Sequence, residues 1–525
     1  MSAGPARDVD AIIVGSGPNG LAAAVVLARA GLSVLVLEAE STLGGGARTL
    51  DLGLAPGITH DLCSAVHPLA VASPFFRAFD LRSRGVELVT PDVSYGQPLD
   101  SRRAALAHRD LGRTVAGLGP DAPTWERFFR PLLAAPDAIV AAALGDKRSL
   151  PRLAGGLGGL YGYGVGARRD ALSGLRTPAS PRAADRLAAA RALASFGLRV
   201  GGEGTPLWNL PWRTEQAKAL LTGVATHAIG RQPSVTTAGT GILLAMLGHA
   251  DGWPIPVGGS QAIANALLAD LEAHGGETRT GVRVRSVEDL PPARAVLFDT
   301  TAEAAAAVLG DTLPARVGRG LQDLGHGPGA AKVDLVLDGP IPWGDPRLGD
   351  AGTVHVGGTR AEMAAAESQV VAGRMPARPV VLVSDPGRFD ASRVVDGLRP
   401  VWAYAHVPAD CPIDPTRFVL AQLERFAPGL RERIVAVRGT PASRMAEHNA
   451  NLVGGDISGG RLGLARLVAR PRWAWETKRL AGTSAYLCSA ATTPGPGVHG
   501  MAGFYAARDV LAQQFGIREH VPLGV

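Results

Sequence analysis

Cysteine is scarce in this sequence of 525 residues. Its three cysteines, Cys63, Cys411 and Cys488, are far apart and odd in number, and no C-x-x-C pair occurs. This pattern excludes a disulfide framework and a dithiol–disulfide redox centre. It is typical of a protein kept in a reducing cytoplasm, where we expect all three thiols to fill small buried positions.

Blocks of like charge and long apolar runs are also missing. The net charge is +6 and the pI about 9.5, but no block of five or six like charges occurs, so nothing indicates nucleic-acid binding. No run of 18 apolar residues is present, which argues against a transmembrane helix. The first apolar segment begins by Val9 and leaves no room for a signal peptide, so we expect a cytoplasmic protein.

A nucleotide-binding pattern occupies residues 9–38. The sequence predicts a strand over Val9–Val14, the turn Gly15-Ser16-Gly17-Pro18-Asn19-Gly20, a helix over Leu21–Ala30 and a strand over Ser33–Leu37. Gly15 permits the tight turn, Gly17 lets a pyrophosphate approach the backbone, and Gly20 lets the helix pack against the sheet. The helix N-terminus favours phosphate. Glu38 is placed to accept hydrogen bonds from ribose hydroxyls and has no basic neighbour, which disfavours a 2′-phosphate.

A second glycine turn follows at residues 44–46, with Arg48 after it. Such a turn can wrap a longer cofactor, and an arginine can neutralise its pyrophosphate. This arrangement resembles the FAD-binding N-terminus of the flavin amine oxidase and phytoene desaturase superfamily. The alternative is a solvated loop with a surface arginine.

Two later segments also carry nucleotide-binding signals. Residues 257–287 predict a glycine turn, an amphipathic helix and a short strand, and Val296–Thr301 predicts a parallel strand. Near the C-terminus, a strand over Tyr486–Ser489 meets a Pro/Gly loop, and a helix of small residues begins at about Met501. The loop glycines would let the backbone approach a flat ring, and the helix N-terminus would favour negative charge on it.

The C-terminal stretch 486–511 resembles the flavin motif of the bacterial phytoene desaturases, in the carotenoid and retinoid oxidoreductase family. It is more similar still to the clade of pyridine nucleotide-disulphide oxidoreductase domain-containing protein 2. Further segments that match are 60–68, 252–260, 402–408 and 451–457, so the resemblance covers nearly the whole chain. It implies FAD as the cofactor and no metal. The residues expected to contact FAD are Gly15, Gly17, Pro18, Asn19, Gly20, Glu38, Ala39, Gly45, Gly46, Arg48, Thr49, Val284, Thr493, Gly497, Val498, Gly500 and Met501.

These signals predict an α/β fold with two interleaved domains. A Rossmann-like FAD-binding domain of the amine oxidase and phytoene desaturase type is expected from residues 1–75, 252–310 and 450–525. An α+β substrate domain is expected from residues 76–251 and 311–449, which carry no cofactor motif.

Two residues are candidates for catalysis. Lys332 lies in an alternating strand before Pro342-Trp343, and flavin amine oxidases carry a lysine at a similar place that reaches the flavin N5 through a water. An exposed strand lysine is the alternative reading. His67 is the second candidate, and with His60, Asp61 and Ser64 it belongs to a segment that either forms a polar wall or satisfies loop backbone.

His499 lies within the expected flavin loop and is expected near the ring. The aromatic pair that flanks the flavin in amine oxidases has no counterpart at His499-Gly500, where one of its tyrosines would fall. A small residue there would leave room over the ring for a bulky apolar substrate.

The leading functional prediction is an FAD-dependent oxidoreductase that desaturates or oxidises an apolar, carotenoid-, retinoid- or lipid-like substrate. The alternatives are amine oxidation with oxygen, isomerase or saturase chemistry, and an FAD-binding regulatory protein with little turnover. No second dinucleotide motif occurs, so NAD(P)H is expected to reduce the flavin poorly. The electron acceptor, oxygen or a quinone, and the oligomeric state stay open.

Residues 128–133 and 157–163 are candidates for peripheral membrane contact, with core packing as the alternative.

Overall fold

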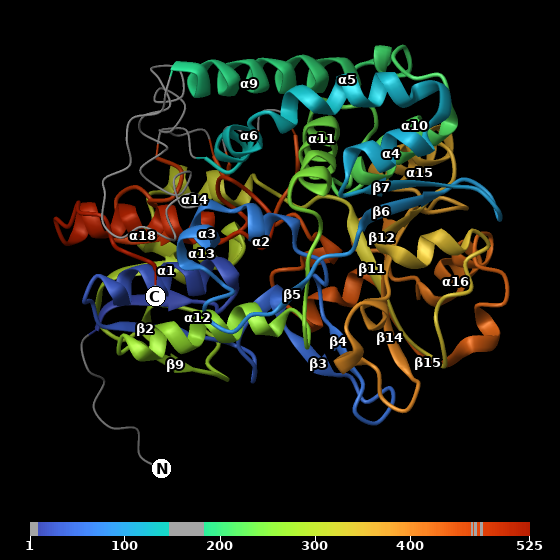
Figure 1. The fold of residues 1–525 in the computed structure, drawn as a ribbon. Helices are drawn as coiled ribbons and strands as arrows, with labels where there is room; N and C mark the ends of the chain where they lie inside the picture. Colours follow the sequence, from blue (N-terminus) through green and yellow to red (C-terminus); the bar gives the residue numbers. More distant parts are fainter. Residues whose placement is uncertain (1–8, 146–182, 464–465, 467–469, 473–475, 525) are drawn as a thin grey trace.

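Two β-sheets form the framework of the molecule, and helices pack around both (Figure 1). The computed structural model describes residues 9–145, 183–463, 466, 470–472 and 476–524. The α/β fold class expected from the sequence is confirmed.

The first sheet has five parallel strands in the order β16-β10-β1-β2-β9. Its strands come from three distant parts of the chain: β1 (Val9–Val14), β2 (Val34–Leu37), β9 (Glu277–Arg279), β10 (Ala293–Phe298) and β16 (Ala485–Leu487). Parallel strands are buried on both faces, which is why the central segments read as continuous apolar runs.

Helices cover both faces of this sheet. On one face, α1 (Pro18–Arg29), α12 (Gln261–Ala273) and α18 (Met501–Gln514) pack on Ala11 and Ile13. On the other face, α13 (Ala302–Leu309) and α14 (Ala315–Gln322) pack on Ile12 and Val14. Successive side chains of a strand point to opposite faces, so β1 contributes to both cores.

The expected element bounds are close to the observed ones, and two of the differences have a clear physical cause. Helix α1 begins at Pro18, three residues before the expected start, because proline is favoured in the first turn of a helix. Strand β10 ends at Phe298 and not at Thr301, because the Thr301 hydroxyl accepts a hydrogen bond from Ala304 N–H and caps α13.

The second sheet has seven strands in the order β15-β11-β14-β13-β12-β6-β7. Only the β12–β6 pair is parallel among the pairs of this sheet in the described residues. The strands are β6 (Val93–Pro98), β7 (Ala104–His108), β11 (Gly329–Leu337), β12 (Ala351–Val356), β13 (Val381–Ser384), β14 (Arg399–Val407) and β15 (Ile434–Thr440).

Further helices lie around the second sheet (Figure 1). They are α4 (Leu111–Gly117), α5 (Ala122–Leu133), α6 (Pro136–Ala143), α9 (Ala183–Glu203), α10 (Glu215–Ala225), α11 (Val235–Ala250), α15 (Arg360–Val371) and α16 (Thr416–Glu424). Short elements link the two sheets: β3 (Thr49–Asp51), β4 (Thr59–Asp61), α2 (Pro68–Ala72), α3 (Pro74–Phe79), β5 (Leu88–Val89) and β8 (Ile255–Pro256).

All strands of the first sheet fall within residues 1–75, 252–310 and 450–525, the ranges expected for the FAD-binding domain. All strands of the second sheet fall within residues 76–251 and 311–449, the ranges expected for the substrate domain. The edges of the two domains stay a prediction.

The apolar segment 128–133 belongs to the core. Phe128 and Phe129 are buried and pack against Trp125 and Trp212. Core packing therefore accounts for this segment, and residues 157–163 lie outside the described part of the chain. No helix that the structure describes is both long enough and apolar enough to cross a membrane.

Candidate functional site

A large cavity, about 810 Å³ in volume, lies between elements of the two sheets. Of the residues expected to contact a cofactor, those that line it are Gly15, Gly17, Pro18, Asn19, Glu38, Ala39, Gly45, Gly46, Arg48, Val284, Thr493, Gly497 and Val498. Lys332 and His67 line the same cavity. The structure thus brings both catalytic candidates and most of the expected cofactor residues to one place.

Four of the expected cofactor residues, Gly20, Thr49, Gly500 and Met501, do not line the cavity. A Cβ on Gly20 would lie 2.5 Å from the Gly15 carbonyl oxygen, and one on Gly500 would lie 2.5 Å from the Phe75 ring. These glycines permit close packing of backbone. Thr49 donates its hydroxyl hydrogen to Asp61, 2.6 Å away, and so supports the loop next to the cavity.

The two glycine turns face each other at the end of the first sheet. Gly15 has a φ of +97°, a conformation that favours glycine, and a Cβ on Gly45 would lie 2.7 Å from the Gly17 Cα. Helix α1 has no side-chain cap at Gly17, and the buried Asn19 Oδ1 has no hydrogen-bond partner in the described residues. Pro18 has no N–H and the Gly20 N–H donates to Asp299, so the Asn19 N–H is the group of the first turn that can bind an anion.

Glu38 stands at the end of β2 and is 8% exposed. Its Oε2 accepts hydrogen bonds from Ser16 N–H, at 2.9 Å, and from the Ser16 hydroxyl, at 2.6 Å, and its Oε1 accepts one from Glu40 N–H. A carboxylate has about four acceptor positions, so Glu38 keeps acceptor capacity for a hydroxyl in the cavity.

Asp299 follows β10 and is a cavity residue that the sequence analysis missed. Its Oδ2 accepts a hydrogen bond from Gly20 N–H at 2.9 Å, beneath the first glycine turn. Burial, together with the nearby Glu38 carboxylate, raises the pKa of Asp299 to about 7. An acid at the carboxyl end of a parallel strand beside the glycine turn is a signal that the sequence does contain.

Arg48 lies at the cavity and is buried. Its Nε–H donates to the Gly45 carbonyl at 3.0 Å, one Nη group donates to the Thr42 hydroxyl at 3.2 Å, and the other donates to the His448 carbonyl. The alternative of a solvated surface arginine is therefore wrong. Arg48 holds the second glycine turn in shape and has two N–H donors left for an anion.

Lys332 is 2% exposed and forms an ion pair with Asp334, so the alternative of an exposed strand lysine is wrong. His60 Nδ1 lies 3.4 Å from the same carboxylate. Burial alone would raise the pKa of Asp334, but Lys332 and His60 hold it below its usual value. Lys332 lines the cavity, and its counter-ion Asp334 lies behind it, outside the lining.

His67 is buried and uncharged, since burial lowers its pKa to about 4 despite the attraction of Asp61. Its Nε2 lies 2.7 Å from the Ser260 hydroxyl, which donates its own hydrogen to the Ser64 carbonyl. The hydroxyl has one hydrogen, so His67 Nε2–H is the donor, and the unpartnered Nδ1 is left with a lone pair.

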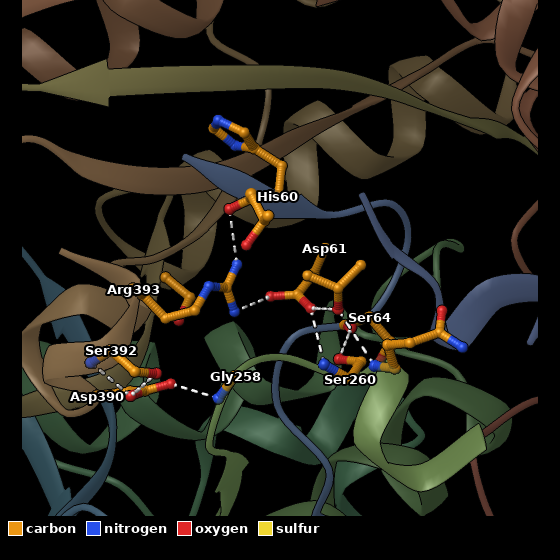
Figure 2. A network of polar contacts seen from close by, with 12 residues as sticks. His60, Asp61, Ser64, Gly258, Ser260, Asp390, Ser392 and Arg393 are labelled. Atoms are coloured by element: carbon orange, nitrogen blue, oxygen red, sulfur yellow. Dashed lines mark hydrogen bonds and ion pairs between the residues drawn. The ribbon is translucent and has the colours of Figure 1, made fainter. Parts of the chain in front are cut away.

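The Asp61 carboxylate, at the end of β4, joins this strand to Ser260 and Arg393 (Figure 2). It accepts hydrogen bonds from Ser260 N–H at 2.9 Å and from Arg393 at 3.0 Å, and Arg393 also donates to the Thr59 carbonyl. Asp61 therefore satisfies backbone and side-chain groups, while Ser64 and His67 line the cavity.

His499 is not a cavity residue, although it was expected near the ring. Its Nδ1 accepts a hydrogen bond from Met501 N–H at 3.0 Å, and its Nε2 donates to the Gly495 carbonyl at 3.1 Å. Both ring nitrogens are used, so His499 fixes the loop before α18. Burial lowers its pKa to about 4.

The wall that comes from the second sheet is aromatic and apolar. Trp402 and Tyr404 on β14 line the cavity with ring centroids 5.1 Å apart, at 73° to each other. No aromatic pair was expected from the sequence, because the position of His499-Gly500 holds no aromatic residue. Because side chains alternate between the two faces of a strand, residues two apart on β14 lie on the same face, and this spacing could have indicated the pair.

Cys63 also lines the cavity and is half-buried. The expectation of three buried thiols is therefore wrong for Cys63.

Comparisons with known proteins agree with this geometry. A family model described as an NAD(P)-binding Rossmann-like domain matches residues 13–80, which contain both glycine turns and Glu38. Pyridine nucleotide-disulfide oxidoreductase domain-containing protein 2 of Rattus norvegicus is 24% identical over 583 residues, which cover 96% of this chain and 93% of that protein. An uncharacterised protein of Mycobacterium tuberculosis is 27% identical over 416 residues, 70% of this chain and 68% of that protein. One chain of the limonene dehydrogenase of Castellaniella defragrans is 27% identical over 124 residues, 24% of this chain and 22% of that protein.

Solved structures share the fold. Wild-type putrescine oxidase bound to putrescine superposes with a TM-score of 0.55 at 17% identity, over 97% of this chain and 100% of that one. Cyclohexylamine oxidase from Brevibacterium oxydans superposes with a TM-score of 0.55 at 15% identity, over 96% of this chain and 98% of that one. The chain therefore carries a Rossmann-like dinucleotide-binding domain, is homologous to pyridine nucleotide-disulfide oxidoreductase domain-containing protein 2, and has the fold of the flavin-dependent amine oxidases.

Proposed function

We propose that this protein is an FAD-dependent oxidoreductase that desaturates or oxidises an apolar organic substrate. One observation carries the proposal: the same cavity is lined by two facing glycine turns with Glu38 and by an apolar, aromatic wall from the second sheet. A dinucleotide and an apolar molecule would therefore meet in one enclosed space, as redox catalysis by a cofactor requires.

The residues at the glycine turns fit FAD. A Cβ on Gly17 would lie 2.5 Å from Asp299 Oδ2, so glycine is needed there for the turn to keep the backbone conformation that a pyrophosphate would approach. Glu38 would accept the ribose hydroxyls, and Arg48 would face the phosphates. When bound, FAD would supply the redox chemistry by accepting a hydride equivalent from the substrate.

The opposite wall fits an apolar substrate of carotenoid, retinoid or lipid type. Trp402 and Tyr404 on β14 face the cavity, and Phe196 on α9 and Leu243 and Leu244 on α11 extend the apolar lining. Burial of apolar surface against such a wall stabilises a complex in proportion to the area removed from water. The similarity of a 124-residue stretch to a chain of limonene dehydrogenase also supports a hydrocarbon-like substrate.

Lys332 would hold a water molecule in the cavity and favour reaction with oxygen as the electron acceptor. Its ion pair with Asp334 holds a positive charge beside the cavity, and a positive charge stabilises negative charge that develops nearby. The same positive charge would repel an ammonium substrate. Amine oxidation has a precedent in the fold of putrescine oxidase, but because of this repulsion it is the second candidate and not the first.

The proposal is tested by adding substrate classes to the purified flavoprotein without oxygen. We expect a fraction of an apolar lipid extract to bleach the flavin absorbance, and amines to leave it unchanged. Bleaching by amines with release of peroxide on aeration would favour amine oxidation. Retention of FAD without bleaching by any apolar compound would favour a regulatory FAD-binding protein.

A further inference from the structure

A second polar feature, a pair of histidines of which one lines the cavity, lies far in sequence from the glycine turns. His227 follows α10, lines the cavity, and lies with its Nε2 3.0 Å from the Nε2 of His355 on β12. Trp253, another cavity residue, packs edge-on against His227 with ring centroids 5.3 Å apart at 81°. The imidazole of His227 is therefore held in one orientation by two aromatic neighbours.

Both histidines are uncharged. Burial lowers the pKa of His227 to about 3 and lowers that of His355 well below its usual value, and neighbouring histidines, His406 among them, add to each effect. His406 is in turn paired with Glu367 at 2.6 Å, so no carboxylate in the described residues is bonded to either ring of the pair. The pair is thus a hydrogen bond between neutral imidazoles, in which one Nε2 donates and the other accepts.

The surroundings of His355 decide which ring donates. Its Nδ1 is buried and has no hydrogen-bond partner in the described residues. If His227 were the donor, His355 would bury an N–H without an acceptor, and such orphaned donors are rare in folded proteins. His355 Nε2–H is therefore the donor, and His227 carries its own hydrogen on Nδ1, for which the described residues provide no acceptor.

We propose that His227 donates a hydrogen bond from Nδ1 to an oxygen atom of the substrate, and that His355 is a positioning residue that fixes this tautomer. The ligand is an otherwise apolar molecule with one uncharged carbonyl or hydroxyl group. This rests on the proposed function, because it identifies the substrate class for the same cavity. A neutral donor in an apolar wall selects an uncharged oxygen and gives the substrate a single orientation.

The test compares two probes with the same carbon skeleton, the ketone carvone and the hydrocarbon limonene. Their dissociation constants are measured by titration calorimetry on the purified holoprotein, for wild type, His227→Phe and His227→Asn. We expect His227→Phe to reduce the preference for carvone over limonene about five- to tenfold, the contribution of one neutral hydrogen bond. Asparagine can place its amide N–H where Nδ1–H lies, so His227→Asn should retain most of the preference.

His274→Phe is the matched control, because His274 lies at the end of α12 and outside the cavity. It should leave the preference unchanged. An unaltered preference in His227→Phe, or failure of both probes to bind the wild type, would overturn the proposal. Binding is read without turnover, so a protein that discriminates the probes but lacks redox activity would refute the proposed function and leave the role of His227 supported.

Discussion

The two walls of the cavity are built in different ways. The wall from the first sheet consists of glycine turns, the N-terminus of α1 and the strand-end acids Glu38 and Asp299. The wall from the second sheet consists of side chains, such as Lys332 and Trp402, on strands that meet only in the fold. The first wall can recognise the backbone of a dinucleotide, while the second determines what reacts with it. Changes in the first should abolish cofactor binding, and changes in the second should alter reactivity with the cofactor retained.

The largest effect on cofactor binding is expected from Gly17→Val. The new side chain would collide with Asp299 and fill the space of the pyrophosphate, so we expect FAD binding to weaken at least about 100-fold, equivalent to roughly 3 kcal/mol of overpacking. Flavin absorbance per protein after gel filtration measures this. Gly318→Ala is the control, because nothing lies within 4 Å of a Cβ there. A Gly17→Val protein with a full complement of FAD would contradict the assignment of the first wall.

Lys332→Met should affect both stability and reactivity. It leaves the buried Asp334 carboxylate without its cation, which is expected to cost about 3–5 kcal/mol in the free energy of unfolding. It should also slow reoxidation of the reduced flavin by oxygen, measured by stopped-flow absorbance. The double variant Lys332→Met with Asp334→Asn removes both charges and should recover stability but not the reoxidation rate. An unchanged rate in Lys332→Met would show that the ammonium group takes no part in reaction with oxygen.

Asp299 should make the stability of the flavin-free protein depend on pH. The folded-state pKa is about 7 and the ordinary value 3.8, so between these values the folded protein holds a proton that the unfolded chain has released. The free energy of unfolding should therefore fall as pH rises from about 4 to 7, by up to about 1.4 kcal/mol per pH unit, and level off above 7. Urea denaturation of wild type and Asp299→Asn at several pH values measures the difference. Parallel curves for the two proteins would refute the raised pKa.

The smallest effect is expected from Trp402→Leu. The shorter side chain loses part of the aromatic contact surface, so limonene should bind up to about tenfold more weakly, while FAD content stays unchanged. Loss of FAD from this variant would show that the two walls do not act separately.

The sequence revealed the first wall better than the second for a physical reason. A glycine turn, the following helix and Glu38 lie within one continuous segment, so their spacing carries the geometry. Asp299 was missed because it approaches Gly17 and Gly20 only when β10 pairs with β1. The burial of Lys332 depends on residues of the two neighbouring strands, Tyr404 on β14 and Thr440 on β15 among them. The histidine pair joins residues 227 and 355, and no local pattern indicates a contact of that kind.

We expect the first glycine turn to anchor FAD, and we expect NADH to reduce this bound flavin poorly. The most direct measurement is to purify the protein, identify the cofactor released on denaturation, and add NADH to the native protein without oxygen. We expect one FAD per chain, little bleaching of the flavin absorbance by NADH, and clear bleaching by an apolar substrate. Absence of flavin, or rapid stoichiometric bleaching by NADH, would contradict it.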